Sequence, residues 1–341
     1  MRVETEWKAA AVLAAATAAY AIKVEKQVAA ARAKEAGKQT AGVQRLPSTG
    51  RVQDHPLFTW VLQNASIFGW KGVMTKLFGD VDPTLPQSKV FLRLLLQNTA
   101  SNELLMLANW FYVTKLYAHV PYFAEKRRDQ SFLEVVKDYA SCNFVVTILS
   151  SLLFSREIVK SAGTKMPDPT FRPLRFLARV AFMRMSVDAV FWIGHLIMHQ
   201  KRWYWMHKKH HEHNKTSLTT NYHFEWYDLV IEGFIPFIIG KMLMEKFHTK
   251  ISSFETDLMA GYVFSYEMLS HAGKPTPLMS IVPPLAPFTQ IWDDRNTWAH
   301  ELHHRVLKAN YSISYYFDKL LGTSRWEQSV QKNKVDTNKE E

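Results

Sequence analysis

Histidine is concentrated in one part of this chain, and this distribution constrains the fold more than any other feature. The chain has 341 residues and 14 histidines, and twelve of these histidines lie between His195 and His304. Eight form three clusters with the patterns HxxxH, HxxHH and HxxHH: His195 and His199; His207, His210 and His211; and His300, His303 and His304. Residues at positions i, i+3 and i+4 share one face of a helix, so we expect each cluster to direct its imidazoles one way.

The clusters predict a metal site. Neutral imidazole is a good ligand for zinc, copper, iron and nickel, whereas many rings packed without a metal would leave ring nitrogens unsatisfied. Eight clustered histidines exceed the roughly three or four ligands of one zinc ion, and two ions with five or six positions each need roughly eight to ten. His223 and His271 lie on segments between the clusters and are the natural ninth and tenth ligands.

Two carboxylates are candidates to hold ligand rings in place. Asp188 lies seven residues before His195, and at about 100° per residue these side chains share a helix face with His199. We expect Asp188 to accept the second ring N–H of a ligand histidine, although pairing with Arg184, one turn away, would also explain a buried aspartate. Glu225, two residues after His223, is a further candidate for the same role.

Composition excludes several classes of protein. A chain that is 47% hydrophobic and 13% aromatic can bury a core, which excludes disorder. The single cysteine, Cys142, excludes a disulfide scaffold and a cysteine-based zinc or iron–sulfur site. The net charge of +11 suggests a nucleic acid or a membrane surface as partner. Nucleic-acid binding explains neither the histidines nor the apolar stretches, so we predict no nucleic-acid partner.

Long apolar stretches predict an all-α protein. They run over 104–123, 135–154, 176–199, 229–244 and 258–269, and isolated charged residues interrupt them. Buried helices of a soluble protein could have this pattern, and so could membrane helices packed around a polar site. We expect multi-pass membrane helices with a helical cap that faces the cytosol and holds a di-metal site. Polar segments at 40–56 and 79–88 predict loops.

The same features divide the chain into four parts. Residues 1–55 are predicted to form an Ala-rich helix, a charged helix and a linker. The apolar part of this helix, 9–22, is shorter than the roughly 20 residues that span a bilayer, so we expect it to be exposed or interfacial. Residues 56–175 would form membrane-associated helices, 176–325 the catalytic domain, and 326–341 a polar tail.

The ordered histidine boxes resemble those of the fatty acid hydroxylase/sterol desaturase superfamily of membrane di-iron enzymes. Asn310-Tyr311, Phe317-Asp318 and Leu321-Gly322-Thr323 are similar to its Asn-Tyr…Trp-Asp…Leu-Gly-Thr tail, with Phe317 replacing the usual Trp. Residues 223–225 resemble its His-Pro-x-Glu element with Phe224 in place of Pro, and 271–273 resemble its His-Ser-Gly element. The resemblance covers about residues 179–323.

The resemblance implies an iron-dependent monooxygenase or desaturase that uses two Fe²⁺ ions and O2 to hydroxylate or desaturate a lipid of the sterol or fatty-acyl type. The chain has no His-Pro-Gly-Gly motif of a cytochrome b5, so a separate electron donor, such as cytochrome b5 with its reductase, is expected. Lysines and arginines flank the second and third boxes, which by the positive-inside rule predicts a site on the cytosolic face, in the endoplasmic reticulum membrane. The alternative from the residues alone is a non-oxidative, histidine-rich zinc membrane protein or hydrolase.

Overall fold

The computed structural model describes residues 56–123, 131–160, 171–247, 251–276 and 295–324, and every regular element in these ranges is helical. The prediction of an all-α chain is therefore confirmed for this part. The α-helices are α2 (Pro56–Phe78), α3 (Gln87–Phe111), α4 (Phe132–Lys160), α5 (Pro173–Met198), α6 (Trp226–Leu229), α7 (Ile235–Phe247), α8 (Ser253–Ser270), α9 (Arg295–Val306) and α10 (Tyr315–Leu321). Two π-helices, η2 (Tyr112–Leu116) and η6 (Val230–Phe234), and three 3₁₀ turns, η3 (Tyr204–Met206), η4 (His210–Glu212) and η5 (Thr220–Tyr222), complete the set.

Local signals in the sequence explain where several helices begin. Before α4, the Ser131 hydroxyl and backbone N–H donate to the Glu134 carboxylate at 2.9 and 2.7 Å, which is a capping box. Before α8, Ser252 caps the helix by accepting from the Glu255 backbone N–H. Pro173 opens α5 at a position where its missing N–H costs nothing. These three helices carry most of the residues that surround the histidines.

The predicted loops agree with the helix bounds, and two of the five apolar stretches, 104–123 and 229–244, contain a π-helix. α2 ends at Phe78 and α3 begins at Gln87, as the polar segment 79–88 predicts, and Gly79 takes the left-handed φ of 63° that ends a helix. The stretch 104–123 is not one continuous α-helix, because α3 gives way at Tyr112 to the π-helix η2. The predicted N-terminal helix and the linker up to residue 55 lie outside the described residues.

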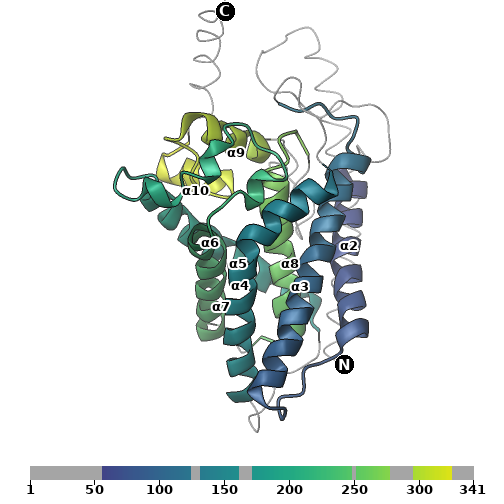
Figure 1. Cartoon of the computed structure of the whole chain (residues 1–341). Helices are drawn as coiled ribbons and strands as arrows, with labels where there is room; N and C mark the ends of the chain where they lie inside the picture. Colours follow the sequence, from purple (N-terminus) through teal and green to yellow (C-terminus); the bar gives the residue numbers. More distant parts are fainter. Residues whose placement is uncertain (1–55, 124–130, 161–170, 248–250, 277–294, 325–341) are drawn as a thin grey trace, which may run out of the picture.

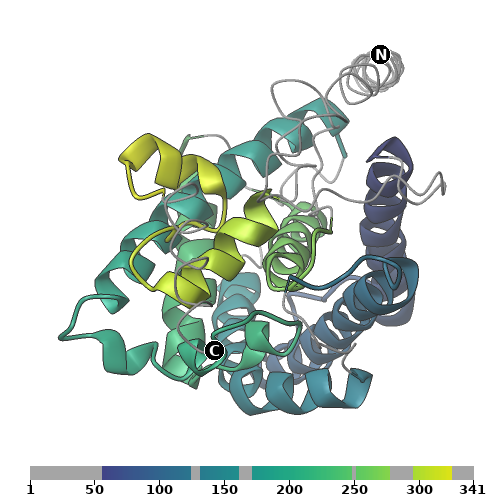
Figure 2. The same cartoon turned by 90° about the horizontal axis from the view of Figure 1, so that it is seen from above.

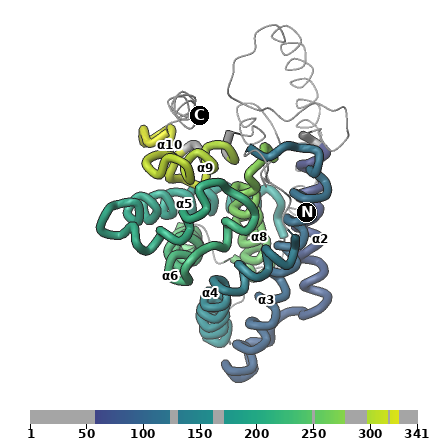
Figure 3. The backbone as a smooth tube through the Cα atoms, turned by 45° about the horizontal axis from the view of Figure 1, so that its top comes forward, coloured from purple at the N-terminus to yellow at the C-terminus, as the bar shows by residue number. Residues whose placement is uncertain are grey.

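The long helices stand beside one another, and α9 and α10 lie at one end of them (Figure 1). α3 packs along α4, and α5 packs along α7. Seen from above, α8 lies between α9 on one side and α2 and α3 on the other (Figure 2). The tube view shows α10 and α9 beside the end of α5 (Figure 3). α8 is thus the central helix. It contacts α2, α3 and α9, and its C-terminal end lies at the histidine-rich end of the molecule.

Close packing of α5 against α7 depends on a glycine. A Cβ atom at Gly240 in α7 would lie 2.8 Å from the Met183 sulfur and 3.4 Å from a Val187 methyl of α5. The absence of a side chain therefore lets the two helices approach, which is a common use of glycine between membrane helices.

The outer surface of the helices is apolar. α4 and α5 are both long and apolar enough to cross a membrane. Large apolar side chains that are more than half exposed occur on α2, α3, α4, α5 and α7, and they include Leu77, Leu96, Phe144, Met185 and Met242. Exposed apolar surface distributed over several helices is typical of a surface that faces lipid or another protein.

Candidate metal centre

The clustered histidines converge at the end of the helices where α9 and α10 lie. His195 occupies the last turn of α5, and His199 caps that helix. The middle cluster lies in the segment between α5 and α6, around the 3₁₀ turn η4. His271 caps α8, and the last cluster lies on α9. Four separate elements thus supply imidazoles to one buried region.

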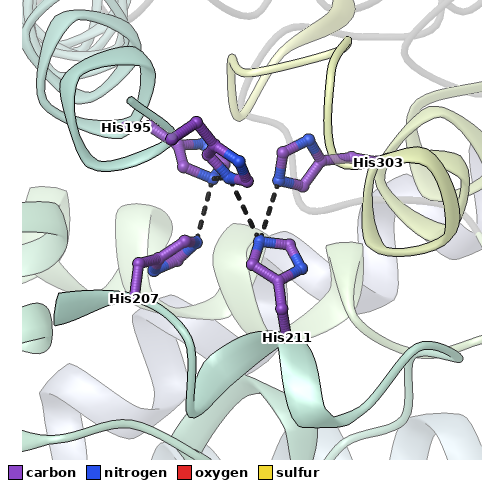
Figure 4. Close-up of side chains that lie close together, drawn as sticks. His195, His207, His211 and His303 are labelled. Atoms are coloured by element: carbon purple, nitrogen blue, oxygen red, sulfur yellow. Dashed lines mark hydrogen bonds between the residues drawn. The ribbon is translucent and has the colours of Figure 1, made fainter. Parts of the chain in front are cut away.

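Five histidines form the first of two groups, which we call the five-histidine group: His195, His199, His207, His211 and His303. Their Nε2 atoms meet, and neighbouring Nε2 atoms are 3.1 to 3.2 Å apart. Figure 4 shows the rings of His195, His207, His211 and His303 directed at one point from three different segments.

Four histidines form the second group, which we call the four-histidine group: His210, His271, His300 and His304. The Nε2 atom of His300 lies 2.6 Å from that of His271 and 3.2 Å from that of His304. His210 completes the group at 3.4 Å from His271. The two groups touch, because the ring centroids of His211 and His304 are only 4.6 Å apart.

The expectation that each cluster directs its imidazoles one way is wrong for two of the three clusters. On α9, His300 and His304 turn to the four-histidine group while His303 turns to the five-histidine group. Rings at adjacent helical positions diverge by about 100°, so His303 and His304 cannot share a direction. The middle cluster is not on an α-helix at all, and the turn at η4 sends His210 one way and His211 the other. Each of these clusters therefore connects the two groups.

Hydrogen bonds fix the orientation of rings in the five-histidine group. The Nδ1 atoms of His195 and His303 lie 2.7 Å from the backbone carbonyls of Tyr311 and Ala309. The Nδ1 atom of His207 lies 2.9 Å from the Asp228 carboxylate. Carbonyl oxygens can only accept, and an ionised carboxylate likewise, so each Nδ1 carries a proton, and a neutral ring then presents a bare lone pair at Nε2.

The four-histidine group is oriented in the same way. The Nδ1 atoms of His271 and His304 donate to the backbone carbonyls of Glu267 and His213, both at 2.9 Å. His210 is held differently, because its ring stacks on Phe224 with centroids 4.2 Å apart and planes 10° apart. Backbone carbonyls and a stacked aromatic ring thus aim these nitrogens at a common point.

The donor set fits metal ions. Nε2 lone pairs that face one another at about 3.1 Å cannot hydrogen-bond to each other, and only a cation between them removes the repulsion. Two nitrogens about 2.1 Å from one ion and about 90° apart are separated by about 3.0 Å. The spacing in the five-histidine group therefore matches neighbouring ligands of a single ion, and the four-histidine group supplies a second set beside it.

Burial keeps these rings neutral. Burial first, and then the neighbouring rings, lowers the pKa of His303 to about 3 and that of His271 to about 4. The same causes hold the pKa of His210 and His304 well below the ordinary histidine value. A metal ligand must be the neutral imidazole, so these four rings are in the binding form near neutral pH.

The lowered pKa values predict that the metal-free protein is destabilised by acid. Histidines of the unfolded chain take up protons near pH 6.5, while His271 in the folded protein stays neutral to about pH 4. Between these values the unfolded state binds more protons, so each such ring removes about 1.4 kcal/mol of stability per pH unit as the pH falls. We expect the unfolding temperature of chelator-treated protein, followed by tryptophan fluorescence, to be flat from pH 8 to 7 and to fall steeply from pH 6.5 to 5. An unfolding temperature that is constant from pH 7 to 5 would contradict the buried neutral rings.

Two residues predicted to belong to the site lie elsewhere. His223 is in neither group, because its ring stacks on His213 with centroids 4.2 Å apart and its Nε2 atom lies 3.1 Å from the Glu212 carboxylate. Glu225 is 43% exposed at its side chain and pairs with Lys209 at 3.3 Å, so it holds no ligand ring. The other nine histidines predicted as ligands are brought together, while their role as ligands stays a prediction.

Asp188 supports the site from a greater distance than predicted. Its carboxylate accepts from the backbone N–H groups of Ile313 and Ser314 at 2.9 and 3.1 Å, and from the Ser314 hydroxyl. It does not contact a ligand ring, because two helical turns, about 10 Å, separate it from His195 on α5. Instead it anchors the segment whose Tyr311 carbonyl orients the His195 ring. The expectation of a direct bond to a histidine was wrong.

Sequence reasoning missed two buried carboxylates. Asp228 on α6 holds His207, and Glu232 lies in the π-helix η6 with its Oε1 atom 3.7 Å from the His195 Nε2 atom. Asp228 is fully buried, and the Glu232 side chain is 6% exposed. Their four-residue spacing within an apolar stretch was the available signal, since acidic residues buried at such depth are functional by default.

A cavity of about 1280 Å³ leads from the histidines into the helices. His195, His210, His271 and His300 line one end, and Lys71, Lys160, Glu245 and Asp257 line the other. Asp257 lies fourteen residues before His271 along α8, which is a distance of about 21 Å. The walls between are mainly apolar and include Leu105, Phe154, Phe191, Phe237 and Phe264. The space has the length and character that a lipid tail requires.

Comparison with known families decides what kind of domain holds this centre. The family model described as Fatty acid hydroxylase matches residues 180–323, which include all nine converging histidines. The chain carries a fatty acid hydroxylase domain. The resemblance to the fatty acid hydroxylase/sterol desaturase superfamily is thereby confirmed over this range. No curated protein and no solved structure matches the chain.

The fatty acid hydroxylase domain connects the fold with the site. The fatty acid hydroxylase domain spans α5 to α10, and it contains both histidine groups, the Asp228 carboxylate and the anchoring Asp188. α2, α3 and α4 precede the matched range and form the opposite walls of the cavity. A fatty acid hydroxylase domain suggests a membrane-associated enzyme that oxidises lipids, and the two apolar helices agree with a membrane location.

Proposed function

We propose that this chain is a membrane di-iron enzyme that uses O2 to hydroxylate or desaturate a lipid. The observation that carries the proposal is the convergence of nine imidazoles in two touching groups, at the end of an apolar cavity, within a fatty acid hydroxylase domain. Two bound ferrous ions, with O2 and two electrons from a donor, would supply the oxidising power towards an unactivated C–H bond that no protein side chain has.

The ligand count favours iron over zinc. The five-histidine group offers five nitrogens to one ion, whereas structural zinc is almost always four-coordinate and catalytic zinc takes three protein ligands. Imidazole ligation without carboxylate or thiolate in the two groups suits iron. The five-histidine group would hold one iron and the four-histidine group the other, each with at least one position left for another ligand.

The residues around the groups have separable tasks. Asp228 and the carbonyls of Tyr311 and Ala309 hold rings so that their lone pairs point inward. The apolar cavity walls admit a lipid tail and limit access of water. Phe191 and Phe224 line the cavity beside the histidines, where they confine the part of the tail that is closest to the metal centre.

The charge distribution suggests where the site lies in the cell. Lys201, Arg202, Lys208 and Lys209 flank the second cluster and Arg305 follows the third, which by the positive-inside rule favours the cytosolic face of a multi-pass protein, in the endoplasmic reticulum. A site on this face is accessible to a separate electron donor such as cytochrome b5 with its reductase. An anionic surface on such a donor would complement the basic flanks.

Iron loading and product analysis test the proposal. We expect full-length protein loaded anaerobically with ferrous iron to retain about two ions per chain, in line with two separate histidine groups. Lipids from cells with and without the gene, compared by mass spectrometry, should differ by added oxygen or lost hydrogen in one lipid class, and only when O2 is present. Folded protein that takes up no iron, or activity that is independent of O2 with zinc bound, would contradict the proposal.

A further inference from the structure

Two carboxylates line the cavity immediately beside the histidines. Glu232 comes from η6, and Glu267 comes from α8, one helical turn before His271. In each carboxylate the Oε1 atom is buried and has no hydrogen-bond partner among the described residues. Arg184 is the nearest source of positive charge to Glu267, but its guanidinium stacks over the Tyr266 ring at 3.7 Å and forms no ion pair within the described residues. Two acceptors are thus left open where the substrate must come closest to the metal centre.

Unpartnered buried carboxylate oxygens are costly, so their presence needs a physical reason. Nearly all buried polar atoms in folded proteins find a partner, and carboxylates most of all. Metal binding does not account for Glu267, whose oxygens belong to neither histidine group. Glu232 is 3.7 Å from the His195 Nε2 atom and 3.6 Å from the His207 Nδ1 atom, too far to bond either ring. Glu232 also forms a group with His207 and Asp228 that could hold a cation, and both Glu232 and Glu267 line the cavity.

The chemistry of the two groups defines what they can bind. A carboxyl group keeps at least one acceptor oxygen in either protonation state, so a donor such as a hydroxyl or an N–H group would satisfy it. A pure hydrocarbon segment at this end of the cavity would leave both oxygens unpaired. A site that is built to hydrogen-bond a substrate donor discriminates strongly against an analogue that lacks the donor.

We propose that Glu232 and Glu267 bind hydrogen-bond donors of the substrate. On this basis the enzyme acts on a lipid that carries a hydroxyl or N–H group close to the carbon that is oxidised, and its tail extends toward the Asp257 end of the cavity. This inference rests on the proposed function, because it takes the cavity to be the substrate site. Binding of the lipid itself requires neither iron nor O2.

Binding of matched lipids to the metal-free protein tests the inference. Full-length protein in phosphatidylcholine nanodiscs is titrated with radiolabelled hexadecan-1-ol, hexadecan-1-amine and 1-methoxyhexadecane, and nanodiscs without protein give the partition background. The methyl ether keeps the oxygen and the tail but has no donor. We expect the alcohol or the amine to bind at least about 10-fold more tightly than the ether, because hydrogen bonds to charged groups are the strong ones. The preferred donor identifies the source as a hydroxyl or an amine.

Substitution of the carboxylates shows whether they cause the preference. In the Glu232→Gln/Glu267→Gln double variant the amides can donate to an ether oxygen, so the preference should fall to within about 2-fold. Glu245→Gln, at the far end of the same cavity, is the matched control and should keep the wild-type ratio. Glu267→Gln alone should lower the ratio without changing iron retention, since Glu267 lies outside both histidine groups. Thermal unfolding of each variant establishes that it is folded.

Two outcomes would overturn the inference. The first is equal binding of the alcohol, amine and ether to the wild-type protein. The second is a donor preference that survives in the folded double variant. Glu232→Gln alone would also count against the inference if it lowered iron retention but not the preference, because this would assign Glu232 to the metal. A protein that showed the donor preference but lacked O2-dependent activity would refute the proposed function and leave the binding site intact.

Discussion

Replacing His303 by alanine is expected to lower the iron content of anaerobically loaded protein from about two ions per chain to about one, with loss of turnover. His303 supplies one of the five nitrogens of the five-histidine group, and its Nε2 atom lies 3.2 Å from that of His211. No neighbouring histidine can take the place of His303, because the other eight converging histidines already belong to the five-histidine group or the four-histidine group. Iron is measured by absorption spectrometry after gel filtration, and turnover by mass spectrometry of the lipid product.

Two further histidine variants make this result specific. His300→Ala removes a nitrogen from the four-histidine group and should also lower iron to about one ion per chain, at the other site. His223→Ala is the matched control, because its ring bonds Glu212 and stacks on His213 outside both groups. It should keep the full iron content. Loss of iron in His223→Ala, with iron retained in His303→Ala, would show that the assignment of ligands is wrong.

Removing the carboxylate of Asp228 is expected to weaken iron binding by about 10–100-fold, the usual cost of losing the group that holds a metal-binding histidine. Asp228→Leu would leave the His207 Nδ1–H group buried without an acceptor and free the ring to turn. Asp228→Asn keeps an acceptor at the same position but loses the charge, so its affinity should be intermediate. Competition with a ferrous chelator measures the affinity of each variant.

Glu225→Gln is the matched control for Asp228. Both are acidic residues near the start of α6, but Glu225 is partly exposed and pairs with Lys209, whereas Asp228 is buried against His207. We expect iron affinity to be unchanged in Glu225→Gln. If Asp228→Leu and Asp228→Asn bind iron as tightly as the wild-type protein, then Asp228 does not orient a ligand and the structure of the centre must be revised.

The sequence was sufficient for the nine histidines that converge and for the class of the fold, but not for the carboxylates around them. The histidines recur at spacings i, i+3 and i+4, and they are more numerous than the ligands of one ion. These two facts predicted a site for two metal ions, because the capacity of imidazole to bind metals depends on residue type and number. Apolar stretches predicted the helices, because helix formation depends mainly on local composition and periodicity.

The remaining features depended on contacts between distant segments. Asp188 was expected at a ligand ring because it shares a helix face with His195, but the nearer partners were the backbone N–H groups of residues 313 and 314, which only the fold brings there. The π-helix η6 turns Glu232 toward the cavity, and a change of helix type by one residue per turn cannot be read from apolar periodicity.

The sequence by itself determined which residues could form the centre, namely an excess of histidines on predominantly helical segments. Only the tertiary structure decided how they are shared, with His303 and His304 directed to different groups and His223 left outside. The physical reason is that a coordination site is defined by the directions of lone pairs in space. Several of those directions are set by groups from other segments, namely the Tyr311 carbonyl for His195, the Asp228 carboxylate for His207 and the His213 carbonyl for His304.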